Sequence, residues 1–327
     1  MQQVDRQKIQ VQAWVFGIGV LILVAKFVAY WLTNSNAILT DAVESIANVA
    51  AGAFALQSLW LAAKPRDRNH PYGHGKVEFV AAAVEGSLIT VAGGLMIAKA
   101  LYDFSTAHTV QHLDQGLWIV AVAGLLNYLM GFVIERQGRI LHSLTMIAEG
   151  KHLKTDAYST VGMMLGLGII VWTGQYWVDN LLAILLGAMI CFTGAKVLRK
   201  SWAGITDEAD EQILRQLITA LEQNRKPAWV DIHNFRVIQY GANWHIDCHL
   251  TLPRYFTIEE GHEAVKEVED LIAAYCPQET EFFIHVDACV DTSCAICHQP
   301  DCPIRKALPS RTVVWRTDNV VRNQKHR

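Results

Sequence analysis

The sequence predicts a membrane protein whose larger part is all-α, with six transmembrane helices, followed by a small cytoplasmic α+β domain. Three observations support this fold class. Apolar runs close to the ~20 residues that a bilayer span needs recur as far as residue 198. Lys and Arg cluster at every second connection between these runs. After residue 205 the sequence turns polar.

Six apolar runs are the expected membrane helices of a transmembrane domain at residues 1–205. They cover roughly residues 11–33, 37–62, 79–103, 115–134, 154–174 and 178–198, each near the length that crosses a bilayer. No small-residue cleavage site follows the first run, so we expect it to remain as a helix and not to be a signal peptide.

The basic residues orient these helices. Arg6 and Lys8 precede the first run, and further Lys and Arg follow the second, fourth and sixth runs. The connections near residues 34–36, 104–114 and 174–178 contain no Lys or Arg. By the positive-inside rule, both termini of this multi-pass protein are expected to be cytoplasmic.

Two pairs of metal-binding side chains lie in or beside the apolar runs. Glu44 and Asn48 belong to the second run, and His152 and Asp156 to the start of the fifth. Residues four apart share a helix face, so two such helices in contact would surround one cation with four ligands. Asp41, one turn before Glu44, is a further candidate. Hydrogen bonding to neighbouring helices is the alternative, but two matched pairs of ionisable or polar groups favour a substrate path.

A second cluster lies in the connection between the second and third runs. Asp67, His70 and His74 are spaced along a turn shaped by Gly and Pro. Three nitrogen and oxygen ligands with an open position suit a transiently bound ion. A solvated basic loop that only follows the positive-inside rule is the alternative, and both readings stay open.

The polar region at residues 206–288 has the pattern helix, strand, strand, helix, strand. We expect these elements at roughly 208–224, 230–239, 243–252, 257–275 and 281–287, forming a small sheet with both helices on one face. Histidines lie on several of these elements, although each one alone is more often an ordinary surface residue.

Four of the seven cysteines lie in a tail at residues 289–304: Cys289, Cys294, Cys297 and Cys302. The cytoplasm is reducing, so we expect thiolate coordination of a soft or borderline metal and no disulfides. The haem-attachment pattern CxxCH also matches at residues 294–298, but such attachment requires export and would leave two cysteines over. A disordered Cys-rich tail is the remaining alternative. The basic residues 305–327 are expected to form a flexible C-terminus that lies against anionic lipid.

Taken together, these motifs resemble the cation diffusion facilitator family of divalent-metal transporters. The resemblance covers nearly the whole chain, through the paired second and fifth helices, the sequence HPYGHGK at residues 70–76 and the C-terminal domain. It implies a metallochaperone-like cytoplasmic domain and a homodimer in the lipid bilayer, in a bacterial inner membrane. The implied activity is export of a divalent cation from the cytoplasm by metal/proton antiport, without enzymatic activity.

The resemblance also assigns residues. It implies a transport site of Glu44, Asn48, His152 and Asp156, and a loop site of Asp67, His70 and His74. It further implies regulatory metal sites at His233, His249, His262, His285 and Asp287, and a charge contact between Lys76 and Asp207.

One departure from the family bears on the choice of metal. Familiar zinc members carry Asp or His followed by Asp where this chain has Glu44 and Asn48. An asparagine offers only a neutral carbonyl oxygen, which weakens zinc binding and favours Fe²⁺, Mn²⁺ or Co²⁺. Zn²⁺ leads on the family's usual behaviour, and Cd²⁺ also stays open. A ligand must shed its proton to bind metal, so His152 suits exchange of metal for protons.

Other functions fit this sequence less well than transport. A membrane-bound metal sensor would also use a Cys- and His-rich cytoplasmic domain, but it would not need ligands inside its spans. A metal-dependent intramembrane hydrolase would need a base motif such as HExxH, which the sequence lacks. A passive channel would conduct without dependence on pH. Nucleic-acid binding is excluded by the membrane tether and the lack of a broad basic surface. Lys26 and Glu85, charges inside apolar runs, have no partner that the sequence assigns.

Overall fold

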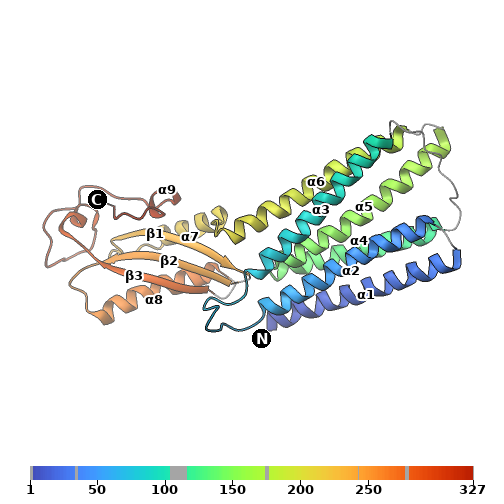
Figure 1. Cartoon of the computed structure of the whole chain (residues 1–327). Helices are drawn as coiled ribbons and strands as arrows, with labels where there is room; N and C mark the ends of the chain where they lie inside the picture. Colours follow the sequence, from blue (N-terminus) through green and yellow to red (C-terminus); the bar gives the residue numbers. More distant parts are fainter. Residues whose placement is uncertain are drawn as a thin grey trace. The chain divides into compact units, whose positions relative to one another are not determined.

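The computed structural model describes residues 3–33, 36–103, 116–173, 177–241, 243–276 and 280–326. Some helical side chains within these ranges also lie outside the description, among them those of Asp41 and Glu44. The chain folds into two compact units, Met1–Thr206 and Asp207–Arg327 (Figure 1).

Six long helices make up the described part of the first unit. They are α1 (Gln3–Thr33), α2 (Asn36–Ala62), α3 (Val77–Asp103), α4 (Gly116–Ile140), α5 (Leu144–Thr173) and α6 (Trp177–Ile205). Each overlaps one of the expected runs. The largest difference is in α5, which begins at Leu144 although the apolar run begins only at residue 154. Charged residues in its first turns lower the hydropathy without ending the helix, so His152 lies inside α5.

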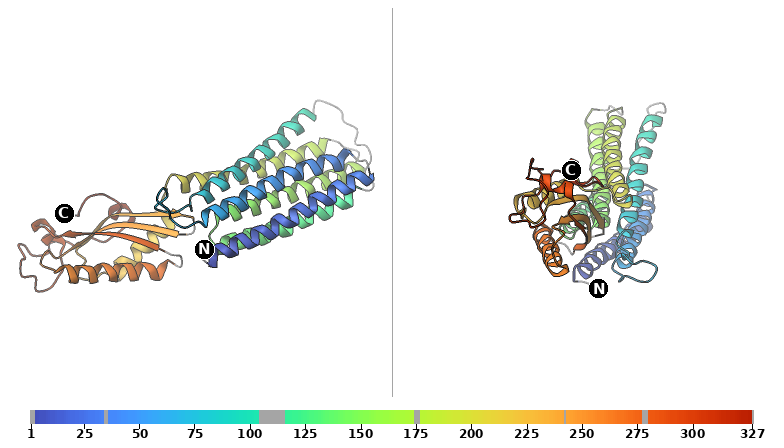
Figure 2. Two further views of the ribbon diagram at one scale, coloured as in Figure 1. Left: turned by 60° about the horizontal axis from the view of Figure 1, so that its bottom comes forward. Right: turned by 90° about the vertical axis from the view of Figure 1, so that its left-hand side faces the viewer.

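Glycines let the helices of this unit pack backbone to backbone. α3 runs along α6 and α4 runs along α5 (Figure 2). A Cβ atom on Gly93 would lie 2.7 Å from the carbonyl oxygen of Gly187, and one on Gly194 would lie 2.8 Å from that of Gly86. Small residues at such contacts allow close approach where apolar burial alone gives little drive for association. The α3–α6 contact therefore depends on the absence of side chains at these four positions.

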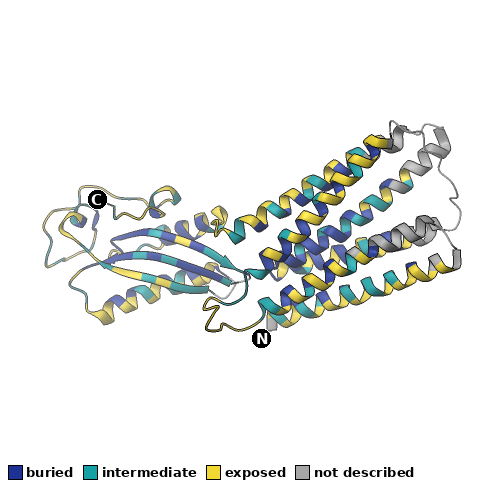
Figure 3. Cartoon of the chain, viewed as in Figure 1, coloured by how far each residue is buried: buried dark blue, intermediate teal, exposed yellow. Residues whose placement is uncertain are grey.

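The outer faces of the helices are apolar. Large hydrophobic side chains that are more than 60% exposed include Trp14, Leu21, Trp31, Leu95 and Phe192 (Figure 3). By length and composition, the helical segments Val4–Val28 and Val77–Tyr102 are able to cross a membrane, and Asn48–Ala62 is a shorter apolar segment. An apolar exterior on this scale is typical of a surface that faces lipid or a partner. The full set of six membrane spans stays a prediction.

A buried polar network joins the starts of three helices. Lys8 on α1 donates a 2.6 Å hydrogen bond to Oε1 of Glu78 on α3, and both side chains are nearly inaccessible. Ser143, just before α5, donates to the other carboxylate oxygen, and Thr145 donates to the Glu78 carbonyl at 3.0 Å. A buried ion pair is tolerated when its remaining hydrogen-bonding capacity is filled in this way.

The second unit is a small α+β domain. Its elements are α7 (Glu211–Gln223), β1 (Asp231–Tyr240), β2 (Asn243–Leu252), α8 (Ile258–Tyr275) and β3 (Thr280–Ala288). The sheet order is β1-β2-β3, with β1 antiparallel and β3 parallel to β2. The crossover between the parallel strands β2 and β3 contains α8. In the register of these two strands, His249 lies opposite His285. Apolar residues of α7 and α8 share one core with the sheet.

The C-terminal segment differs from the expectation of a flexible basic tail at residues 305–327. Trp315, only 3% exposed, and Val320 belong to the domain core. The guanidinium of Arg225 lies 4.0 Å from the centre of the Trp315 ring and donates to the Val313 carbonyl at 2.7 Å. Sequence composition suggested flexibility because apolar residues are few here. Two buried side chains and a stacked arginine nevertheless supply the packing, and the short helix α9 (Thr317–Val320) follows.

We expect Gly93→Ala to lower the thermal unfolding midpoint of the detergent-solubilised protein. The added methyl group would clash with the backbone of α6, which costs about 1–3 kcal/mol for overpacking. Gly94→Ala is the matched control, because nothing lies within 4 Å of its added Cβ. Equal midpoints for the two variants would contradict the close α3–α6 contact.

Candidate metal sites

Asn48, His152 and Asp156 form a hydrogen-bonded trio between α2 and α5. The Asn48 amide nitrogen donates to Oδ2 of Asp156 at 2.6 Å, and its Oδ1 lies 3.1 Å from Nε2 of His152. His152 Nε2 is 3.8 Å from the same Asp156 oxygen. The structure thus brings together three of the four main residues predicted for this site. Glu44, the fourth, and Asp41 lie outside the described side chains.

The surroundings of this trio are also polar and buried. Lys26 on α1 is buried and donates a 2.7 Å hydrogen bond to Oγ of Ser45 on α2. A cavity of about 30 Å³, room for roughly one water molecule, is lined by Asn48 and Glu149 together with residues of α1 and α4. Asn48, one member of the trio, therefore borders a small cavity between the helices.

Two buried carboxylates lie on the far side of the His152 ring. Oε2 of Glu85, on α3, is 3.6 Å from Nδ1 of His152, and Glu149, on α5, lies next to Glu85. Glu85 is fully inaccessible and Glu149 nearly so. Within the described part of the chain, both oxygens of Glu85, Oε2 of Glu149 and Nδ1 of His152 have no hydrogen-bond partner. Buried polar atoms without partners are costly, so such a group usually serves an ion, water or proton.

Sequence reasoning did not identify Glu149 and left Glu85 without a partner. The signal for Glu149 was its spacing of three residues from His152, which places both on one helix face. Glu85 gave no local signal, because its neighbour His152 lies on another helix. The His152 ring thus has a carboxylate near each of its nitrogens. Asp156 of α5 lies near Nε2, and Glu85 of α3 lies near Nδ1.

The loop between α2 and α3 brings its three predicted ligands together. Ligand atoms of Asp67, His70 and His74 all lie within 4.8 Å of one another. Oδ1 of Asp67 accepts hydrogen bonds from the backbone nitrogens of Asn69 at 2.9 Å and His70 at 2.7 Å. The His70 backbone bond in particular holds the pKa of the Asp67 carboxyl below its ordinary value. The carboxylate is therefore ionised and orients both imidazoles.

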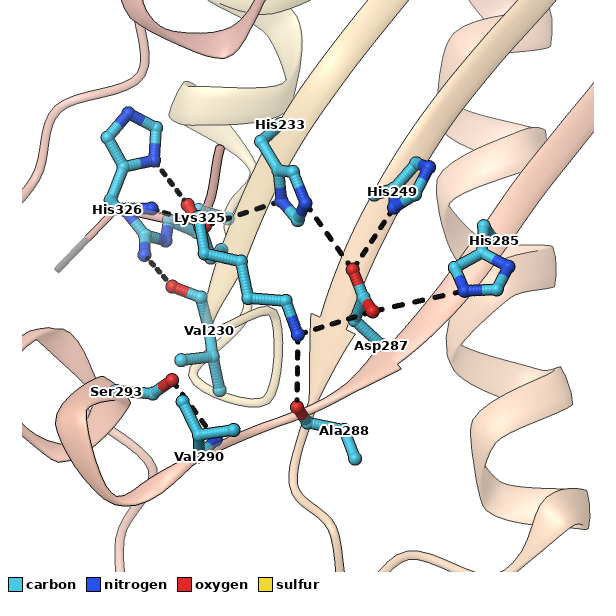
Figure 4. Close-up of polar contacts among 12 residues, drawn as sticks. Val230, His233, His249, His285, Asp287, Ala288, Val290, Ser293, Lys325 and His326 are labelled. Atoms are coloured by element: carbon cyan, nitrogen blue, oxygen red, sulfur yellow. Dashed lines mark hydrogen bonds and ion pairs between the residues drawn. The ribbon is translucent and has the colours of Figure 1, made fainter. Parts of the chain in front are cut away.

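The second unit holds another group of three potential metal ligands on its sheet. Ligand atoms of His233, His249 and Asp287 also lie within 4.8 Å of one another. Oδ2 of Asp287 is 3.1 Å from His249 Nδ1 and 3.4 Å from His233 Nε2, while Oδ1 is 3.9 Å from His285 Nε2. Figure 4 shows these three imidazoles gathered around the one carboxylate. His262 lies exposed on α8, and no hydrogen bond or ion pair among the described residues joins it to the group.

The end of the chain reaches this same carboxylate. Lys325 places its ammonium 3.2 Å from Oδ1 of Asp287 (Figure 4). His326 places Nδ1 2.5 Å from Oδ1 of Asp231. Burial by itself raises the pKa of Asp287, but its hydrogen bonds with His249 and Lys325 outweigh that effect and lower the pKa. The carboxylate is thus ionised and partly neutralised by a cation of the protein itself, which a metal ion would have to displace.

The remaining predicted residues are placed as follows. Cys289, Cys294, Cys297 and Cys302 are free thiols that line one small cavity after β3. Lys76 and Asp207 belong to different units, and their charge contact stays a prediction.

Comparison with known proteins gives two family matches. The model of the cation efflux transmembrane domain matches residues 13–205, and that of the cytoplasmic domain of cation efflux proteins matches residues 209–289. The matches include the helix trio, the loop group and the sheet group. Three of the four tail cysteines and Lys325 lie beyond them.

Similar curated proteins cover most of the chain. An uncharacterized transporter of Synechocystis is 30% identical over 248 residues, which are 76% of this chain and 80% of the relative. Zinc transporter ZitB of Yersinia pestis is 24% identical over 90% of this chain and 91% of the relative. Manganese efflux system protein MneP of Bacillus subtilis is 23% identical over 82% of this chain and 92% of the relative.

We expect Lys325→Ala to tighten zinc binding at the His233–His249–Asp287 group by up to about fivefold, since a partly exposed ion pair is worth up to about 1 kcal/mol. Calorimetric titration of the whole detergent-solubilised chain would measure this, with the binding step lost in His249→Ala assigning the site. Lys266→Ala, which removes an exposed lysine of α8, should leave that step unchanged. Weaker binding in Lys325→Ala would show that the ammonium assists the site instead of competing for it.

Proposed function

The chain belongs to the cation efflux family of integral membrane transporters, and from this premise we propose that it exports a divalent metal cation from the cytoplasm in exchange for protons. The observation that supports this proposal most directly is the trio of Asn48, His152 and Asp156, in which His152 is buried and the other two are partly buried. Three potential ligands from two helices converge there, and one of them, Asn48, lines a small cavity. Burying polar groups inside an apolar helix bundle costs free energy, so the groups found there usually have a function such as binding a substrate.

Each residue of the transport site has a distinct role in this proposal. Asp156 supplies a carboxylate, His152 its Nε2 and Asn48 its amide oxygen, with Glu44 as the fourth ligand. Before a cation enters, the side chains of Asn48, His152 and Asp156 are paired with one another. Binding breaks the 2.6 Å bond from Asn48 to Asp156 and turns both side chains toward the ion. One substrate cation would meet two carboxylates, so the occupied site would be neutral.

Glu85 is proposed as the residue that positions His152. A ligating imidazole usually donates its other ring N–H to a carboxylate, which sets the tautomer and the ring orientation. Nδ1 of His152 faces Glu85 Oε2 at 3.6 Å, so Glu85 would hold a proton on Nδ1. Loss of the Nε2 proton that is shared with Asn48 Oδ1 would then free Nε2 for the cation. Because a ligand must be deprotonated to bind metal, entry of the cation displaces protons from the site. This competition provides a physical basis for antiport.

Zinc is the proposed main substrate, and manganese, iron, cobalt and cadmium remain alternatives. One relative is named for zinc and another for manganese. The neutral oxygen of Asn48 contributes less electrostatic attraction than a carboxylate, which favours harder or less tightly held divalent ions. The identity at this position is therefore expected to tune selectivity.

The groups outside the helix trio are proposed to support transport. The Asp67 group would collect cations from solution, because two of its three members are exposed. The His233, His249 and Asp287 group, with His285 close by, would sense the cytoplasmic cation level. The cytoplasmic domain would also pair in a homodimer, with both chain termini in the cytoplasm of a bacterial cell and the helices in its inner membrane.

A membrane-bound metal sensor is the second candidate, since its ligand-rich cytoplasmic domain would look the same. A sensor needs no ligands between helices. Cells that accumulate metal when Asp156 is replaced would favour transport over sensing.

We expect Asp156→Ala and His152→Ala to lower zinc uptake into proteoliposomes by at least about tenfold, because each removes one ligand. Uptake by the natural chain should rise with an imposed pH gradient. Ser159→Ala, a change close by on α5 where the hydroxyl only contacts the Thr155 carbonyl, should retain transport. Uptake that is indifferent to the gradient would contradict antiport.

We expect Asn48→Asp to shift competition between Zn²⁺ and Mn²⁺ toward Zn²⁺, because the added charge strengthens binding most for the ion higher in the affinity order. Transport of each metal in vesicles, alone and in competition, would measure the shift. Asn127→Asp adds the same charge to the same cavity from α4 and serves as the control. Unchanged selectivity in Asn48→Asp would argue against Asn48 as a ligand.

A further inference from the structure

The segment that follows β3 gathers four thiols around one small cavity. Cys289, Cys294, Cys297 and Cys302 all line it, and its volume is about 10 Å³, close to the space of a single water molecule or ion. Nearly all the other lining residues come from this segment, the main exception being Arg254. Each of the four cysteines is a free thiol.

Local backbone contacts build this arrangement. The Cys289 N–H donates to the Leu252 carbonyl at 2.9 Å, which anchors the first cysteine to the end of β2. A short 3-10 helix, Asp291–Ile296, then carries Cys294, and the Cys297 N–H donates back to the Cys294 carbonyl at 3.4 Å. The chain therefore turns tightly enough for two cysteines three residues apart to face one cavity, as in many zinc sites of the CxxC type.

Backbone donors already point at two of the sulfurs. The Arg254 N–H donates to Cys289 Sγ at 3.4 Å, and the Lys306 N–H donates to Cys294 Sγ at 3.5 Å. Hydrogen bonds of this kind stabilise the charged thiolate, which is the form that binds metal.

Positive charge also borders the cavity. Arg254 and Arg305 both line it, and Arg305 is held in place by a 3.1 Å hydrogen bond to the Cys297 carbonyl. Arg254 is already paired with Asp291, another residue of the lining, at 3.2 Å. Arg305 is therefore the guanidinium that would offset part of the net charge of about −2 on four thiolates around a divalent ion.

We propose that Cys289, Cys294, Cys297 and Cys302 form a four-thiolate site for one zinc-class cation, separate from both the helix trio and the His233 group. No three of the sulfurs lie within 4.8 Å of one another, so the cation would draw the side chains inward by rotation about their Cα–Cβ bonds. Four protein ligands leave no open position, which is typical of a structural site and not of a transport step.

The chemistry disfavours the other readings of these cysteines. His298, the histidine of the CxxCH pattern, is exposed, does not line the cavity and has Nε2 3.3 Å from Oγ1 of Thr312. Thiolates select zinc or a softer ion over Mn²⁺ or Mg²⁺. The site would fix the start of the C-terminal segment whose end carries Lys325 to Asp287.

The test measures metal content and spectra of the whole protein, purified in detergent under reducing conditions and reloaded with Zn²⁺ or Co²⁺. We expect Cys294→Ser/Cys302→Ser to retain one zinc ion fewer per chain than the natural sequence. The absorption band of thiolate-to-cobalt charge transfer should be present in the natural chain and lost in the variant. Cys191→Ser, which removes a thiol of α6 outside the cavity, should keep both.

A second readout guards against simple misfolding. Bound zinc should protect four thiols of the natural chain from alkylation, and a chelator should make them reactive again. The variant His249→Ala, which lacks the sheet group, should show the same protection of its thiols. The proposal is overturned if the cobalt band is absent from the natural chain, or if zinc content and thiol protection are the same in the double variant.

Discussion

Polar groups enclosed between apolar helices must find partners among themselves, and this constraint organises the first unit. Asn48, His152 and Asp156 satisfy one another across α2 and α5, with a 2.6 Å bond from the amide to the carboxylate. Lys8 and Glu78 do the same across α1 and α3. In a surrounding without water such contacts are worth keeping, since the alternative is an unpaired dipole or charge. The site and the scaffold therefore obey the same rule.

Two buried carboxylates near the trio lack hydrogen-bond partners for most of their oxygens, which is expected where an ion or a proton binds. Glu85 and Glu149 are buried beside His152, and three of their four carboxylate oxygens have no hydrogen-bond partner within the described residues. A core built only for stability would not retain such groups. In the second unit, by contrast, Lys325 and three imidazoles surround the carboxylate of Asp287. In the proposal, a metal ion would replace protons in the first unit and the Lys325 ammonium in the second.

The candidate sites use two kinds of ligand, nitrogen and oxygen atoms in some and sulfur atoms in another. In the proposal, the nitrogen and oxygen ligands at the helix trio and the loop would hold a divalent ion less tightly than thiolates, as transport requires. The four thiols after β3 would hold their ion far more tightly. Their position matters for the rest of the domain, because the segment they begin supplies Trp315 to the core and Lys325 to the sheet group.

Local properties of the sequence were enough to predict the six helices of the first unit and the order of elements in the second. They also pointed to Asn48, His152 and Asp156, which the structure brings together. Hydropathy and the spacing of four residues are read along one helix, so they need no knowledge of neighbours. The same locality explains the failures. The start of α5 was misplaced because charged residues masked it, and the C-terminal segment was expected to be flexible because its two buried anchors are not adjacent in sequence.

By itself the sequence determined which residues were able to bind a cation and on which helix faces they lie. Only the tertiary structure decided that Asn48 meets Asp156, 108 residues away, and that Glu85 lies against His152. It alone brought the last residues of the chain to Asp287. The reason is physical: helix periodicity is a property of neighbouring residues, whereas the pairing of buried charges depends on which helices and strands pack together.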